Sequence, residues 1–218
     1  EDTNRIRKIA AEEGAIYMGK TGILFARGPG KTYPDFKIGA HYICYKNRRA
    51  TTEALKSFRK HYPYAPVRLI SDGGEDFSNL AVQFNCSYEH ANQIGNGKST
   101  TFQSHEQAFE WLHRLRITCE SMPDVSGVVI LEDDVHTQDR ISRLPSTPIA
   151  GPCTMIYSRA AIDYINFLHP GLLVRGWSGC GGTIIDRHVF LKCMNKPLDL
   201  NLAEKLDPRI INHSDALL

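Results

Sequence analysis

The sequence lacks the features that mark membrane-spanning and nucleic-acid-binding proteins. Its apolar runs, such as Val128 to Leu131, are far shorter than the roughly 20 residues that cross a bilayer as a helix. Neither sign of charge dominates, because 26 basic and 24 acidic residues leave a net charge of +2. This balance gives no support for binding to nucleic acid or to an anionic membrane surface. We therefore expect no nucleic-acid partner and no membrane span in this chain.

Cysteine pairs with a metal-binding spacing are also missing. The six cysteines lie far apart, and no two of them form a Cys-x-x-Cys pair. This spacing argues against a zinc site and is too sparse for a fold held by disulfides. The chain opens on Glu1-Asp2 rather than on a signal peptide, although a chain without an initial Met can be a fragment of a larger protein. These features favour the cytoplasm, with the Golgi lumen or the secretory route as the alternative for a fragment.

Strand and helix patterns alternate regularly from Gly39 onward. The expected elements are strands at 41–45, 67–71 and 128–131 and helices at 51–61, 77–84 and 104–121. Such alternation is typical of an α/β fold with a mostly parallel central sheet flanked by helices. We expect a single Rossmann-like domain at 39–218. Residues 1–38 contain a charged stretch and then Gly- and Pro-broken sequence, so we interpret them as an N-terminal arm or linker.

Three consecutive acidic residues, Glu132-Asp133-Asp134, follow the strand expected at 128–131. Ligands of open α/β sheets bind outside the carboxyl ends of the strands. Adjacent carboxylates remain charged at low cost only where a cation or solvent screens them. Mn²⁺ or Mg²⁺ does this while bridging to substrate phosphate oxygens. The pattern predicts a metal site at Asp134 and Asp133, and a solvated acidic turn is the alternative.

A second polar turn, Ser71-Asp72-Gly73-Gly74, follows the strand expected at 67–71. Its glycines would let the backbone approach a ligand closely. The carboxylate of Asp72 would offer an acceptor to a base imide or a ribose hydroxyl. An ordinary turn is the alternative for this segment taken alone.

These two turns, together with the strand that carries Ile43 and Tyr45, resemble the motifs of GT-A glycosyltransferases, especially those of family 2. The resemblance implies a nucleotide-sugar donor, with a UDP-sugar favoured, and a glycan or other hydroxyl acceptor. It also implies that the nucleotide is held by Ile43, Tyr45, Asp72, Gly73 and Asp133. The acidic triplet corresponds to the family's Asp-x-Asp motif, and its last member, Asp134, would bind Mn²⁺ or Mg²⁺ directly.

The later part of the chain resembles the family more weakly. Gly181 and Gly182 look like the family's Gly-Gly strand, where the backbone meets the donor sugar or the acceptor. Trp177 would stack on a sugar face or else pack in the core. Because family members often use a late histidine as an additional ligand, His213 is a candidate for the metal.

The chain departs from the family pattern at the general base, because no Glu-Asp pair follows Gly182 as it does in inverting members. Asp199, at a plausible helix start, is the preferred candidate for the base, and Asp186 is the second. A plain helix N-cap is the alternative for Asp199. Cations available to meet phosphate from the neighbouring loops include Arg140.

Two other classes of function remain as alternatives. The segment from Gly14 to Thr21 satisfies the P-loop pattern, but a charged stretch precedes it and Gly28-Pro29 follows it closely, where a P-loop requires a strand and a helix. The second alternative is a catalytically inactive sugar-nucleotide-binding domain. The function predicted from the sequence is metal-dependent transfer of a sugar from a nucleoside diphosphate.

Overall fold

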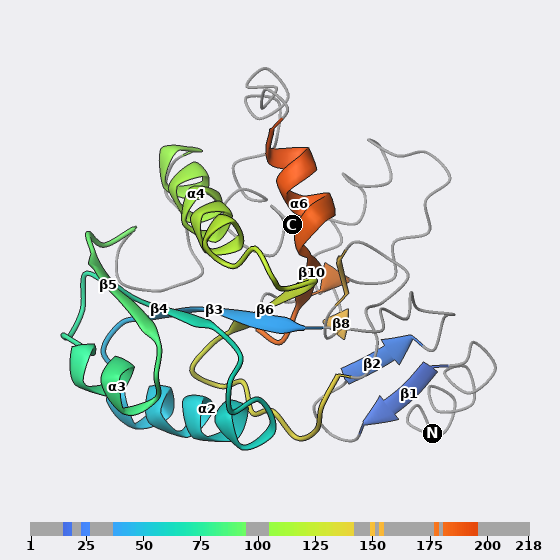
Figure 1. Ribbon diagram of the computed structural model, residues 1–218, viewed down its shortest axis with the longest axis horizontal. Helices are drawn as coiled ribbons and strands as arrows, with labels where there is room; N and C mark the ends of the chain where they lie inside the picture. The colour runs from blue at the N-terminus through green and yellow to red at the C-terminus, as the bar shows by residue number, and fades with distance from the viewer. Residues whose placement is uncertain are drawn as a thin grey trace.

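The computed structural model describes residues 15–18, 23–26, 37–94, 105–141, 149–150, 153–154, 177–178 and 181–195. Among these residues, a six-stranded sheet in the order β5-β4-β3-β6-β10-β7 forms the centre of the fold (Figure 1). Its strands are β3 (Ile38–Cys44), β4 (Val67–Asp72), β5 (Ser87–Ala91), β6 (Gly127–Leu131), β7 (Ile149–Ala150) and β10 (Ile184–Asp186). Strand β3 is parallel to β4 and β6, and β5 is parallel to β4, whereas β10 is antiparallel to both β6 and β7. The predicted α/β class with a mostly parallel sheet is confirmed.

Helices cover both faces of this sheet (Figure 1). Helices α2 (Arg48–His61) and α3 (Ser78–Gln83) lie on one face, and α4 (His105–Ser121) and α6 (Arg187–Met194) lie on the other. Side chains of a strand alternate between the two faces. Tyr42 of β3 therefore joins the cluster under α2, while its neighbour His41 faces α4 and lies against Trp111.

Helix α2 begins three residues before the start that the sequence predicted. Asn47 is the N-cap, because its side chain accepts a hydrogen bond from the Ala50 N–H. The hydroxyl of Thr51, inside the helix, lies 3.0 Å from the Asn47 carbonyl and 3.2 Å from Asp133 Oδ1, and it shares its proton between these two acceptors. The helix thus begins beside the carboxyl end of β3, and its first turn reaches the edge of the sheet where the parallel strands end.

The directions of the strands determine which loops meet at that edge. Strands β3, β4 and β6 end there together, since Cys44 is level with Ser71 and Tyr42 is level with Leu131. The loops that follow these strands include the two polar turns expected from the sequence. Strand β10 runs the opposite way: it begins beside this edge and ends at Asp186, level with Gly127 at the start of β6.

A separate hairpin precedes the central sheet. Strands β1 (Ala15–Met18) and β2 (Ile23–Ala26) pair antiparallel, with Ala15 opposite Ala26. A P-loop would require residues 15–18 to form a loop around phosphate and a helix to follow it. A strand occupies that segment instead and a second strand follows it, so the P-loop alternative is contradicted. Residues 4–13, which belong to the charged stretch at the start of the chain, lie outside the described residues.

Two more short strands, β8 (Cys153–Thr154) and β9 (Trp177–Ser178), form an antiparallel pair. None of the helices in the described segments combines the length and the apolar character needed to cross a bilayer.

Candidate functional site

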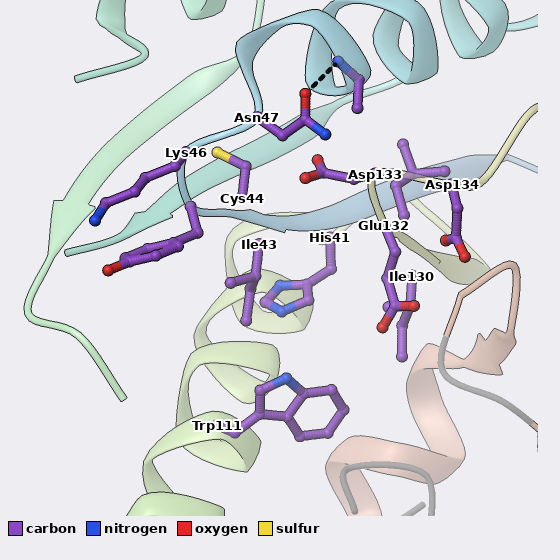
Figure 2. Close-up of a pocket in the computed structure, with 13 residues that line it drawn as sticks. His41, Ile43, Cys44, Lys46, Asn47, Trp111, Ile130, Glu132, Asp133 and Asp134 are labelled. Carbon is purple, nitrogen blue, oxygen red and sulfur yellow. Dashed lines mark hydrogen bonds between the residues drawn. The ribbon is translucent and has the colours of Figure 1, made fainter. Parts of the chain in front are cut away.

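A cleft of about 540 Å³ opens at the carboxyl ends of β3 and β6. Its walls come from the end of β3, the first turn of α2, the middle of α4 and the loop after β6. Figure 2 shows an acidic end at Asp133 and Asp134 and an apolar end at Ile43 and Trp111 on the α4 side of β3, the side to which Glu132 also points. It lies where ligands of open α/β sheets bind.

Asp133 is fixed at the acidic end by two hydroxyl groups. The Tyr42 hydroxyl donates to Asp133 Oδ1 at 2.7 Å, and the Thr51 hydroxyl lies 3.2 Å from the same oxygen. Burial raises the pKa of Tyr42 well above its usual range, and the Asp133 carboxylate raises it further. Tyr42 therefore stays protonated and remains a hydrogen-bond donor. The side chain of Asp133 is oriented by β3 and α2 and not by solvent.

Asp134 is the most exposed member of the triplet. It lines the cleft, and in the described part of the chain no hydrogen bond or ion pair engages its carboxylate. Glu132 is half-buried and lies against the Gly181 backbone, since a Cβ at Gly181 would stand 2.8 Å from Glu132 Oε2. The Gly182 N–H donates to the Ile130 carbonyl at 2.8 Å and thereby holds the Gly-Gly turn beside the acidic loop.

The apolar end of the cleft is formed by Ile43, Ile130 and Trp111 around His41. The rings of His41 and Trp111 meet edge to face, with centroids 6.3 Å apart and an interplanar angle of 87°. His41 is fully buried, and its Nδ1 lies 2.7 Å from the Thr118 hydroxyl. Burial, together with the positive charges of Arg68 and Arg114, lowers the pKa of His41 to about 3. The imidazole is neutral at physiological pH.

Tyr45, Lys46 and Asn47 form the rim between the two ends. The Lys46 Nζ lies 4.7 Å from the centroid of the Tyr45 ring, and the Tyr45 hydroxyl donates to Gln93 at 3.4 Å. The structure therefore brings together Ile43, Tyr45, Asp133 and Asp134 of the residues that the sequence singled out.

Asp72 is engaged by the protein itself. Its Oδ1 accepts hydrogen bonds from Arg114 Nη1 at 2.9 Å and from the Ile94 N–H at 2.7 Å. Both side chains of the ion pair are buried, and Asp72 is not among the residues that line the cleft. The interpretation of Asp72 as the acceptor for the base is therefore not supported. Its carboxylate fixes the segment that follows β5 against α4.

The glycines of the second turn also serve internal packing. A Cβ at Gly74 would stand 1.7 Å from the Tyr45 carbonyl oxygen, and Gly73 has a φ of +67° with the Gln93 backbone within 2.6 Å of its Cβ position. The Glu75 N–H donates to that same Tyr45 carbonyl at 2.8 Å. These glycines therefore permit a close approach of two segments of the chain. The sequence interpretation had instead placed Gly73 against the nucleotide.

Of the two candidates for the general base, the structure describes only Asp186. Asp186 caps α6, because its Oδ1 accepts from the N–H groups of His188 and Val189 at 3.0 and 3.1 Å. It lies level with Gly127, about 13 Å along β6 from Leu131 at the usual rise of a strand. This position is at the edge of the sheet opposite the cleft and argues against Asp186 as the base. Asp199 lies outside the described residues.

Three further expectations concern single residues. His213 lies outside the described residues, and for Trp177 only the backbone of β9 is described. Arg140 donates from Nε to the His61 carbonyl at 2.6 Å, at the end of α2 that is remote from the cleft. Arg140 is therefore held away from the place where phosphate was expected.

Sequence reasoning missed His41 and Trp111 as components of the cleft. His41 lies in the strand expected at 41–45 and Trp111 in the helix expected at 104–121, and neither was singled out there for binding. A polar ring inside an otherwise apolar strand is the signal that could have identified His41. Its partner Thr118 lies 77 residues away, so the contact cannot be derived from local spacing.

No family model matches the chain, and no curated protein sequence matches it either. Solved structures do match it. The galactosyltransferase LgtC, solved with donor and acceptor sugar analogs, is 12% identical at a TM-score of 0.48, and the match covers 82% of this chain and 68% of LgtC. Glucosyl-3-phosphoglycerate synthase from Mycobacterium tuberculosis, solved with Mn²⁺, UDP and glucosyl-3-phosphoglycerate, is 12% identical at a TM-score of 0.43, with coverages of 71% and 58%. A cytidylyltransferase from Leptospira borgpetersenii is 8% identical at a TM-score of 0.38, with coverages of 82% and 68%.

Two of these matched proteins are glycosyltransferases, the class to which the motifs pointed. The chain spans little more than half of the synthase. At these identities and TM-scores below 0.5, the matches assign no activity, donor or metal to this chain.

Proposed function

We propose that this protein is a metal-dependent glycosyltransferase that moves a sugar from a nucleoside diphosphate donor to a hydroxyl acceptor. One observation carries the proposal: an exposed acidic loop and an apolar, ring-lined recess share one cleft at the carboxyl ends of parallel strands. A cation and a diphosphate suit the first end, and a heterocyclic base suits the second. The two ends together match the two parts of a nucleotide-sugar donor.

Asp134 is the proposed direct ligand of Mn²⁺ or Mg²⁺, with Asp133 beside it. The donor set fits such an ion because carboxylate oxygens are its preferred ligands. Within the described segments, no group of three His, Cys, Asp or Glu residues converges as a complete metal site. That arrangement agrees with an ion held by one or two carboxylates and completed by phosphate oxygens and water. When bound, the metal supplies positive charge to the diphosphate leaving group.

The remaining cleft residues have proposed roles that follow from their positions. Tyr42 and Thr51 keep Asp133 in one orientation, which lowers the cost of ordering the loop when the donor binds. Ile43 and Tyr45 flank the nucleotide. Gly181, whose backbone contacts Glu132, leaves room for the donor sugar or the acceptor beside the acidic loop.

Calorimetry of UDP binding with and without Mn²⁺ tests the proposal. We expect Mn²⁺ to strengthen UDP binding to the wild-type chain and to have little effect in Asp134→Ala. The matched control is Asp139→Ala, which removes an exposed carboxylate five positions further along the same loop, outside the cleft lining. Equal affinity with and without the metal in the wild type, or an unchanged metal effect in Asp134→Ala, contradicts the assignment.

A panel of UDP-sugars then distinguishes an enzyme from a binding domain. Transfer or slow hydrolysis of one UDP-sugar that depends on Mn²⁺ and on Asp134 supports the transferase. Metal-dependent binding of UDP without turnover of any donor and acceptor pair supports the catalytically inactive alternative.

A further inference from the structure

The protonation state of His41 follows from its hydrogen bonds. The Thr118 hydroxyl lies 3.0 Å from the Arg114 carbonyl, which can only accept, so the single hydroxyl proton is directed there. The same oxygen lies 2.7 Å from His41 Nδ1 and must accept from it. Nδ1 therefore carries the proton of the neutral ring. Nε2 is left with a free lone pair and is an acceptor only.

This acceptor has no donor in the described part of the chain. His41 Nε2 is buried, and no side chain or backbone group there donates to it. A buried acceptor without a partner is unfavourable, and native proteins seldom retain one without a reason. His41 is one of the residues that line the cleft, and its ring lies on the α4 side of β3 beside Trp111 (Figure 2), so the lone pair lies at the boundary between the cleft and the packed interior.

The surroundings of His41 restrict what can satisfy the lone pair. Ile43, Ile130 and Trp111 form apolar walls around the ring. The neighbouring Arg68 and Arg114 oppose protonation of the imidazole, because a second positive charge would be repelled. The recess therefore offers apolar surfaces and one neutral acceptor, with the Glu132 carboxylate at its edge beside Ile130 (Figure 2). This combination fits a heterocycle that presents an N–H group.

We propose that His41 Nε2 recognises the donor's base by accepting a hydrogen bond from the imide N–H of uracil. The proposal rests on the proposed function, since it concerns the nucleotide of that donor. It gives His41 the role for which the sequence pointed to Asp72, whose Oδ1 already accepts two hydrogen bonds from the protein. A base with no hydrogen at this position leaves the buried lone pair unpaired, and the cleft discriminates against it.

The test compares binding of UDP with that of UDP methylated at N3 of uracil, using the full chain with Mn²⁺ present. The methyl group removes the imide hydrogen and leaves the diphosphate and ribose unchanged. We expect the wild type to prefer UDP by about tenfold or more, as for the loss of one hydrogen bond to a buried acceptor. In His41→Leu the preference should disappear. The matched control, His90→Leu, alters an exposed histidine of β5 outside the cleft lining and should retain it.

A second measurement decides the matter if His41→Leu does not fold. In wild-type protein labelled with ¹⁵N, the Nε2 resonance of His41 should be that of an unprotonated nitrogen. UDP should shift this resonance, whereas the N3-methylated nucleotide should not. A histidine that only packs against Trp111 would not distinguish the two nucleotides.

The outcomes separate this inference from the proposed function. Metal-dependent UDP binding without preference between the two nucleotides, or a preference that survives in His41→Leu, overturns the role of His41 and leaves the transferase proposal standing. Absence of any UDP binding overturns both. A preference that is lost in His41→Leu, or a resonance shift with UDP alone, supports the role of His41.

Discussion

Removing the carboxylate of Asp72 should destabilise the fold strongly, because Arg114 would remain buried without its partner. The side chains of this ion pair are only 5% and 7% exposed, so solvent cannot replace the lost charge. Breaking a buried ion pair at one partner costs about 3–5 kcal/mol. For a chain of this length that free energy corresponds to a fall in Tm of about 6–20 °C. We expect Asp72→Ala to show a loss of this size in urea and thermal unfolding followed by circular dichroism.

Two further variants check the physical cause. Asp72→Leu combined with Arg114→Leu removes both charges and should recover most of the stability, since an apolar pair of similar volume often replaces a buried ion pair without loss. Glu110 is the other carboxylate paired with Arg114, and its side chain is 48% exposed, so Glu110→Ala should cost less than about 1 kcal/mol. If Asp72→Ala unfolds like the wild type, the ion pair does not stabilise the fold as argued here. A double variant as unstable as Asp72→Ala would also refute the reasoning.

The remaining predictions concern pH and backbone packing. Unfolded His41 takes up a proton near pH 6.5, whereas its folded-state pKa is lowered to about 3, so its contribution to stability is present above 6.5 and is lost as the pH falls towards 3. The free energy of unfolding of the wild type should therefore fall more steeply over this range than that of His41→Leu, by up to about 1.4 kcal/mol per pH unit in urea titrations. Gly74→Ala places a Cβ 1.7 Å from the Tyr45 carbonyl oxygen and should cost about 3 kcal/mol or more in the same assay. In Gly181→Ala the added Cβ meets only the end of the Glu132 side chain and a neighbouring methyl group. The free energy of unfolding should therefore fall by no more than about 1 kcal/mol, while Mn²⁺-dependent UDP binding should weaken. An unchanged metal effect in this variant contradicts the proposed place of the Gly-Gly turn.

The sequence by itself determined the elements of the central sheet and one end of the cleft. Hydrophobic periodicity is a local property, so the strands that became β3, β4 and β6 and the helix α4 could be located from it. The position of Glu132-Asp133-Asp134 at the carboxyl end of a buried strand also follows from the sequence alone. In a parallel sheet that end is the usual ligand-binding edge, so the acidic end of the cleft was predictable.

Contacts between distant segments were decided only by the tertiary structure. Asp72 and Arg114 are 42 residues apart, and Tyr42 and Asp133 are 91 residues apart. Whether a carboxylate faces a ligand, a buried arginine or a tyrosine hydroxyl depends on which elements pack against it. Sequence spacing does not contain that information for residues so far apart.

The direction of strand β10, which only the tertiary structure shows, decided where Asp186 lies. Strand β10 is antiparallel to β6, so Asp186 ends at the edge opposite the acidic loop, although Gly181 begins the same segment beside Glu132. A buried strand has the same hydrophobic pattern whether it pairs parallel or antiparallel with its neighbour. The sequence therefore could not indicate this orientation. For His41, the side-chain period of two could predict which face of β3 it shares. Only the packing of α4 against that face placed its imidazole beside Trp111 at the boundary of the cleft.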